Sequence, residues 1–287
     1  MRVPEPSLLL LIPAYNEEAR IEPVLRLYAD FFAGNYSGNF QLVVVLNGCR
    51  DNTLGVVQSV AKDFHSVSYM DFPAPIGKGG ALIEGLKLAG NADYIGFVDA
   101  DGATGPEAVL KLLPFLKTAD CVIGSRWLPG SVLLKAQPIF RQLVSRCFHI
   151  IVELLFWMHI KDTQCPCKLM RRAAVEKIHP TLRIADLAFD VNLLVSLKRA
   201  GFRIEEVPIE WTDVVGSKVT TSLFRNSFAM FLSVVRVWLI NTPRLYKLLG
   251  FMRPLEGWIY KKLRTPVPLA AVKIESPKPK PEDKPKA

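Results

Sequence analysis

The chain has 287 residues, half of them hydrophobic, which is enough for one large domain with short appendages. Its net charge of +9 favours an anionic partner such as a phosphorylated substrate, nucleic acid or an acidic membrane surface. Five irregularly spaced cysteines argue against a disulfide framework and against a zinc site, and they fit reduced thiols in the cytosol.

Short apolar runs alternate with helical patterns through the first half of the chain. The predicted strands are 8–12, 41–46, 67–70, 94–98 and 120–123, and the predicted helices are 17–32, 52–63, 78–89 and 105–117. Buried strands that alternate with helices predict an α/β domain with a mostly parallel, Rossmann-like sheet flanked by helices. Such sheets bind ligands beyond the carboxyl ends of their strands, so we expect the site in those loops.

The second half of the chain is more apolar and carries scattered basic residues. We expect an apolar segment over 137–160, a polar loop over 162–168, a helix over 189–200, a strand over 203–209 and an apolar helix over 222–240. No stretch offers the ~20 uncharged apolar residues that a membrane-spanning helix needs. The predicted division is a catalytic domain over 1–220, apolar and basic C-terminal helices over 221–265, and a Pro- and Lys-rich disordered tail over 266–287.

Two carboxylates stand one residue apart where the predicted strand 94–98 ends. Asp99 and Asp101 repel each other at this spacing, and a divalent cation is the obvious counter-charge. Mg²⁺ and Mn²⁺ prefer oxygen ligands and often bind substrate phosphates as well. A turn that caps the next helix explains the same residues, so the tripeptide alone leaves both interpretations open.

A glycine-rich turn, Gly77-Lys78-Gly79-Gly80, opens the predicted helix 78–89. It lacks the Ser or Thr and the earlier glycine of a phosphate-binding P-loop. Free N–H groups at a helix start can still bind an anion. A plain strand-to-helix turn explains the glycines equally well.

Eight motifs in chain order resemble the family 2 glycosyltransferases of the GT-A fold. They are PAYNEE, NGCRDNT, GKGGAL, DADGAT, GSR, DTQCPCK, AFDVNLL and GSK. The resemblance covers residues 7–248 and is nearest to the dolichyl-phosphate β-glucosyltransferases and the polyprenyl-phosphate glycosyltransferases. It implies an inverting, metal-dependent enzyme that moves a hexose from a nucleoside-diphosphate sugar to a polyprenyl or dolichyl phosphate. Glucose is the hexose that the resemblance favours.

The resemblance also implies a role for individual residues. The nucleotide-sugar pocket would be lined by Pro13, Tyr15, Asn16, Glu17, Asn47, Lys78, Asp99 and Lys218. Asp99 and Asp101 would bind Mg²⁺ or Mn²⁺, and Arg126 and Arg141 would bind the acceptor phosphate. Asp190 and Asp162 are the candidate catalytic carboxylates, although either could be structural, because a phosphate acceptor is already anionic and needs no strong base.

Several alternatives stay open at this stage. The family usually has two aspartates after its second strand, and this chain has Leu46 and Asn47, which leaves both UDP and GDP open as the nucleotide. A GDP-mannose-dependent polyprenyl-phosphate mannosyltransferase, a transferase to a soluble acceptor and a non-catalytic nucleotide- or lipid-binding module are the rivals. The sugar, the prenyl chain and the oligomeric state are not specified, and no role for nucleic acid is expected.

A lipid-linked acceptor requires contact with a membrane. The apolar segments 143–160 and 222–240 are interrupted by arginines, which fits helices that lie in the membrane interface. Core helices explain part of each segment as well. We therefore expect a cytoplasmic protein with C-terminal interfacial helices, attached peripherally to the cytoplasmic face of a membrane.

Overall fold

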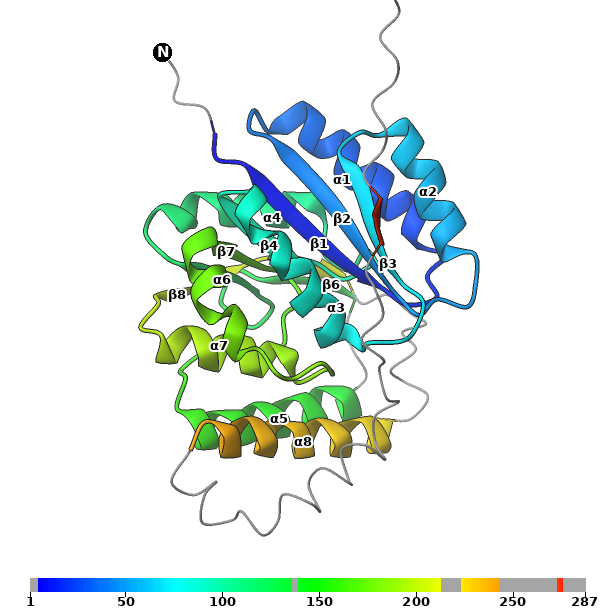
Figure 1. Cartoon of the computed structure of the whole chain (residues 1–287). Coiled ribbons are helices and arrows are strands. Elements are labelled where there is room, and N and C mark those ends of the chain that lie inside the picture. Colours follow the sequence, from blue (N-terminus) through cyan, green and yellow to red (C-terminus); the bar gives the residue numbers. More distant parts are fainter. Residues whose placement is uncertain (1–4, 136–138, 213–222, 243–272, 276–287) are drawn as a thin grey trace, which may run out of the picture.

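The computed structural model describes residues 5–135, 139–212, 223–242 and 273–275. Its centre is an eight-stranded sheet in the order β10-β3-β2-β1-β4-β7-β5-β8 (Figure 1). The strands are β1 (Leu8–Ala14), β2 (Phe40–Asn47), β3 (Val67–Phe72), β4 (Tyr94–Phe97), β5 (Cys121–Ser125), β7 (Lys168–Arg171), β8 (Ile204–Pro208) and β10 (Lys273–Glu275). Only β7 and β10 run antiparallel to their neighbours, so the predicted mostly parallel α/β sheet is confirmed.

Helices cover both faces of this sheet (Figure 1). They are α1 (Ile21–Asn35), α2 (Thr53–Asp63), α3 (Lys78–Gly85), α4 (Pro106–Leu112), α5 (Ile139–Phe156), α6 (Arg172–Ile178), α7 (Phe189–Arg199) and α8 (Leu223–Ile240). Contacts join α1 to α2 and α4, and they join α7 to α3 and α6. Short 3₁₀ turns, η1 (Leu86–Asn91), η2 (Leu113–Lys117) and η3 (His179–Thr181), follow α3, α4 and α6, so two of the predicted helices end earlier than the sequence suggested.

A third layer lies beyond α7. Figure 1 shows α5 and α8 side by side at the bottom of the molecule, and α8 contacts both α5 and α7. In the described ranges, no helix combines the length and the apolar character that crossing a bilayer requires. The two apolar segments of the sequence form a helical pair, α5 and α8, that packs against α7.

Five elements of the structure, β6, β7, β9, β10 and α6, were not predicted from the sequence. The predicted polar loop 162–168 leads directly into β7 and α6. The sequence gives little signal for β7, because the strand has only four residues and two of them, Leu169 and Met170, are apolar. A separate two-stranded sheet pairs β6 (Val132–Lys135) with β9 (Glu210–Thr212). Residues 273–275, inside the predicted disordered tail, form β10 beside β3, and the rest of that tail lies outside the described residues.

The buried strands place their carboxyl ends along one edge. Residues 8–12 of β1 are fully buried, and the backbone N–H of Val98 still donates to the carbonyl of Leu11 (3.0 Å). The chain therefore leaves the sheet at Asp99, beside the loops that follow β1 and β2. This edge is where a parallel sheet binds ligands.

The glycine turn before α3 packs against the segment that precedes α7. Gly77 has φ +75°, and a Cβ there would lie 2.2 Å from the carbonyl oxygen of Ala185. The N–H of Gly80 donates to that same oxygen (3.0 Å). One N–H of the predicted anion-binding turn is therefore already used within the protein, and the start of α3 is fixed against the start of α7.

We predict that Gly77→Ala will lower the free energy of unfolding by about 2 kcal/mol or more, because it combines a left-handed backbone with a collision against a carbonyl. The matched control is Gly34→Ala in α1, where a Cβ meets nothing within 4 Å and φ is not left-handed. That control should be neutral or slightly stabilising. Urea unfolding of both variants tests the difference, and equal stability of the two would contradict it.

Candidate functional site

The loops after β1 and β2 are tied to each other by hydrogen bonds. The N–H of Glu17 donates to Thr53 Oγ1 (2.8 Å), and the N–H of Arg50 donates to Asn16 Oδ1 (2.7 Å). Asn16 has φ +55°, a conformation that asparagine tolerates better than most residues. The carboxylate of Glu17 pairs with Arg20 at 2.6 Å. Asn16 and Glu17, both predicted to line the nucleotide pocket, thus lie in a pair of loops that hydrogen bonds join. We call them the braced loops.

The remaining predicted nucleotide residues near this loop differ in how far they face solvent. Tyr15 is exposed and Pro13 is half-buried at the end of β1. Asn47 is buried, and its Oδ1 accepts a hydrogen bond from the N–H of Ile76 (2.5 Å). This amide, which stands where the resemblance led us to expect a carboxylate, therefore holds the segment leading to the glycine turn. Lys218 lies outside the described residues.

Lys78 provides the counter-charge for the paired aspartates. Its Nζ lies 2.5 Å from Oδ1 of Asp99, which is part-exposed at the sheet edge. Burial disfavours the ammonium, but the charges of Asp99, Asp190 and Asp101 outweigh it and raise the pKa of Lys78. The lysine and Asp99, 21 positions apart in the sequence, are therefore brought together as an ion pair.

Asp101 is held in the turn that follows. Its Oδ1 accepts the N–H of Ala103 (3.0 Å), so the local turn that rivalled metal binding is present. Burial and the nearby charge of Asp99 raise the pKa of the Asp101 carboxyl, although the Ala103 hydrogen bond and Lys78 act against this rise. The other Asp101 oxygen is not committed by that turn, so the turn and a metal contact are compatible.

The donor set at this edge fits Mg²⁺ or Mn²⁺ only in part. Asp99 and Asp101 supply hard carboxylate oxygens, as these ions prefer. Across the described part of the chain, no group of three or more His, Cys, Asp or Glu side chains could hold a metal ion. A divalent cation here would need further oxygens from a substrate, and Mg²⁺ typically binds through one or two carboxylates together with substrate phosphates.

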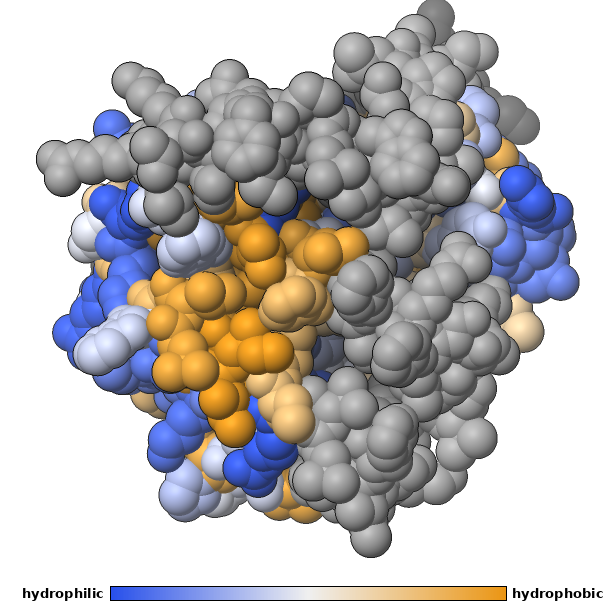
Figure 2. Space-filling view, turned by 90° about the horizontal axis from the view of Figure 1, so that it is seen from below, coloured by the Kyte–Doolittle hydropathy of each residue, from blue (hydrophilic) through white to orange (hydrophobic). Residues whose placement is uncertain are grey.

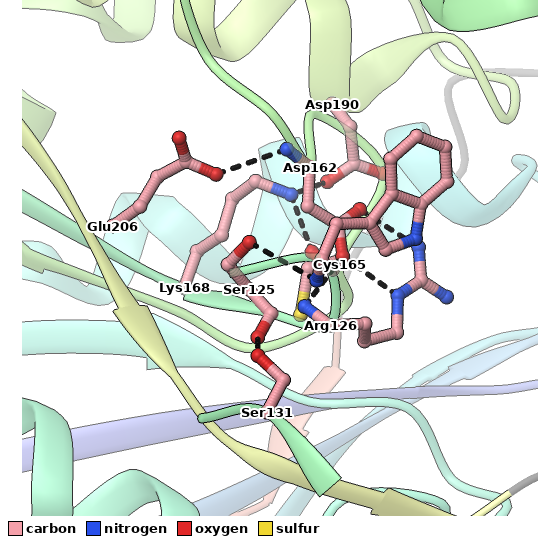
Figure 3. A network of polar contacts seen from close by, with 9 residues as sticks. Ser125, Arg126, Ser131, Asp162, Cys165, Lys168, Asp190 and Glu206 are labelled. Atoms are coloured by element: carbon pink, nitrogen blue, oxygen red, sulfur yellow. Dashed lines mark hydrogen bonds and ion pairs between the residues drawn. The ribbon is translucent and has the colours of Figure 1, made fainter. Parts of the chain in front are cut away.

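Arg126 and Asp162 form a two-pronged ion pair. Nε and Nη2 of Arg126 lie 2.7 Å and 2.8 Å from the two carboxylate oxygens, and the Arg126 N–H also donates to Oδ2 (3.0 Å). Glu206 accepts the N–H groups of Lys161 and Asp162, so Asp162 sits between Glu206 and Arg126 (Figure 3). Despite burial, the hydrogen bonds to Arg126 lower the pKa of Asp162.

A second ion pair lies deeper in the protein. Lys168 is 0% exposed, and its Nζ lies 2.5 Å from Oδ1 of Asp190 and 2.5 Å from the carbonyl oxygen of Cys165 (Figure 3). Asp190 itself is only 4% exposed, at the start of α7. Sequence reasoning selected Asp190 but gave no role to Lys168, although Lys168 ends the DTQCPCK motif.

The segment before α7 connects α8 to this site. Oδ2 of Asp186 accepts the hydroxyl of Ser233 from α8 (2.6 Å), and its Oδ1 accepts the N–H of Ala188 (2.8 Å). Ala185, one residue earlier, contacts the glycine turn that carries Lys78. Arg141, the second predicted acceptor residue, belongs to α5, but its side chain lies outside what the structure describes.

The chain is similar to known proteins over most of its length. The family model described as glycosyl transferase family 2 matches residues 10–179. A dolichyl-phosphate β-glucosyltransferase of Saccharomyces cerevisiae is 32% identical over 250 residues, which cover 79% of this chain and 73% of the relative. The Drosophila melanogaster protein of the same name is 32% identical over 230 residues, covering 76% and 70%.

Solved structures share the fold at low sequence identity. A glucosyl-3-phosphoglycerate synthase of Mycobacterium tuberculosis, in complex with Mn²⁺, UDP and phosphoglyceric acid, has a TM-score of 0.60 at 19% identity, covering 81% of this chain and 78% of that one. A mannosyl-3-phosphoglycerate synthase of Rubrobacter xylanophilus has a TM-score of 0.58 at 14% identity, covering 83% and 75%.

We predict that Lys168→Met will cost about 3–5 kcal/mol of unfolding free energy, because it leaves the buried Asp190 without its counter-charge. Lys168→Met combined with Asp190→Asn should cost less than Lys168→Met alone. The control is Arg26→Met in an exposed ion pair, which should cost less than about 1 kcal/mol. Urea unfolding measures all three, and a loss below 1 kcal/mol for Lys168→Met would contradict the prediction.

Proposed function

Because the chain belongs to glycosyl transferase family 2, we propose that it transfers glucose from a UDP-linked donor to a dolichyl or polyprenyl phosphate with inversion at the sugar. The observation that carries the proposal is the arrangement of charged side chains at the sheet edge. Asp99, Asp101 and Lys78 meet there beside the braced loops after β1 and β2. The names of the relatives support the acceptor and the sugar, and the UDP complexes of the structural neighbours support the nucleotide.

The donor would bind with its diphosphate at Asp99 and Asp101. A bound Mg²⁺ or Mn²⁺ would neutralise the charge that develops on the departing nucleoside diphosphate. Asp99 and Asp101 would hold that ion, and the positive charge of Lys78 would face the same phosphates. The mobile ammonium suits this task because its flexible stem can follow the ligand.

The acceptor phosphate is assigned to Arg126. Asp162 occupies Nε and one N–H of Nη2, and no described residue hydrogen-bonds to Nη1. Cζ of Arg126 also lies 5.3 Å from the centroid of the Trp211 ring, a cation–π contact on a further side of the guanidinium. An arginine oriented on two sides keeps its remaining N–H groups available for phosphate oxygens.

Neither candidate carboxylate needs to remove a proton. The oxygens of Asp162 bind Arg126, and an oxygen of Asp190 binds Lys168. The acceptor phosphate is anionic at neutral pH and can attack without a general base. We therefore assign Asp162 the orientation of Arg126, and Asp190 the stabilisation of the cations beside it.

The helical pair α5–α8 would attach the protein peripherally to a membrane that contains the acceptor, on its cytoplasmic face. Figure 2, the underside of the molecule, shows an apolar patch on this layer. Exposed large apolar side chains on α5, just after it and on α8 are Ile150, Leu154, Trp157 and Phe231. Such a patch beside basic residues is typical of proteins that bind the membrane interface.

We predict that Asp101→Asn will reduce glucose transfer on the order of 100-fold or more, because an amide is a poor ligand for a hard cation. The assay is release of UDP from UDP-glucose in the presence of a polyprenyl phosphate. Asp30→Asn, at an exposed position of α1, is the control and should keep full activity. Full activity of Asp101→Asn, or wild-type activity unchanged by EDTA, would refute the metal assignment.

We predict that the protein floats with anionic liposomes at low salt and is partly released by high salt, since salt screens charge but not apolar insertion. Leu154→Ser combined with Trp157→Asn should weaken flotation by about tenfold or more, because both side chains are 69% exposed and would be buried in lipid. Asparagine suits the left-handed φ of Trp157. Leu27→Ser, at an exposed position of α1 away from α5 and α8, is the control. Wild-type protein that never floats would exclude membrane attachment.

A further inference from the structure

One carboxylate at the sheet edge has two possible cationic partners. Asp99 is paired with the ammonium of Lys78 at 2.5 Å, and it is also one of the two carboxylates assigned to the metal. A lysine side chain is ordinarily protonated at neutral pH, and this one lies in direct contact with the carboxylate that the metal would use. At neutral pH a metal ion that approaches Asp99 therefore meets a full positive charge.

We propose that Lys78 competes with the divalent cation for Asp99 and moves to the donor's diphosphate when the nucleotide sugar binds. The proposal rests on the proposed function. It adds that the metal is bound firmly only when the donor is bound as well. The metal alone binds weakly, and the metal and the nucleotide strengthen each other's binding. Lys78 thus makes metal retention conditional on the presence of a donor.

The backbone around Lys78 leaves the movement to its side chain. Gly77 and Gly79 lie against the carbonyls of Ala185 and Ile184 so closely that a Cβ at either position would collide with them. The first turn of α3 is therefore fixed in place. A lysine side chain has four methylene groups and three donors, so its ammonium can change partners while the helix stays still.

Lys78 has a second carboxylate near it besides Asp99. Asp190 acts on Lys78 as a second negative charge, after Asp99, and is itself held by Lys168. When the ammonium of Lys78 leaves Asp99, it therefore still has a carboxylate nearby. The diphosphate offers at least as much negative charge as the carboxylate that it replaces, and charge-assisted hydrogen bonds to phosphate are strong.

Removing the ammonium should change two affinities in opposite directions. In Lys78→Met, Mn²⁺ without nucleotide should bind about 10- to 100-fold more tightly, because a nearby positive charge is gone. UDP in the presence of Mn²⁺ should bind about tenfold or more weakly, because a phosphate contact is lost. A lysine with only a structural role would weaken both on removal.

The experiment measures Mn²⁺ binding by electron paramagnetic resonance, with and without UDP, and UDP binding by calorimetry. Lys78→Gln repeats the test with a polar side chain that carries no charge. Lys87→Met removes an exposed lysine paired with Glu84 and should change neither affinity. Thermal unfolding checks that each variant is folded.

The outcomes separate this proposal from the proposed function. Tighter Mn²⁺ binding together with weaker UDP binding in Lys78→Met supports it. Unchanged or weaker Mn²⁺ binding in Lys78→Met and Lys78→Gln overturns it, while a wild type that binds UDP with Mn²⁺ keeps the donor assignment. A wild type that binds no UDP with any divalent cation overturns both. Mn²⁺ must also strengthen UDP binding by the same factor by which UDP strengthens Mn²⁺ binding, because linkage is reciprocal.

Discussion

The organising constraint of this protein is the cost of placing several carboxylates at the edge of a buried sheet. An isolated charge in such a place is strongly disfavoured, so each carboxylate needs a partner. Asp99 has Lys78, Asp162 has Arg126 and Asp190 has Lys168, and every pair joins segments distant in the sequence. The loops that would bind substrate are thereby connected through opposite charges.

These pairs differ in what they can do chemically because they differ in exposure. Lys168 and Asp190 are sealed from solvent, and removing either partner would leave a buried charge. The Lys78–Asp99 pair lies at the surface of the site, where an incoming ion or phosphate can compete with it. The buried pair therefore serves the architecture, while the outer pair can exchange partners during a reaction.

Sequence patterns were sufficient for the parallel strands β1 to β5 and for the sheet edge at which Asp99 lies. The runs that became β1 to β5 are apolar and separated by helical patterns, and Asp99 lies at the strand end where it was expected. The ion pairs could not be predicted, because Lys168 and Asp190 are 22 positions apart and Arg126 and Asp162 are 36 apart. The antiparallel β7 was missed because four residues carry too little periodicity. The hydrogen bond from Ile76 to Asn47 likewise depends on tertiary structure alone.

The hydrogen bond between Ser233 and Asp186 joins α8 to the segment before α7. It therefore helps to set the distance between α8 and the sheet edge at which the site lies. A helix tied to the segment before α7 cannot sink into lipid without carrying the sheet edge with it. With α8 lying in the headgroup layer, the reacting phosphate of an acceptor would have to stand at one level above the hydrocarbon. The protein would then discriminate among lipids by the length of their polar part, independently of any contact with the prenyl chain.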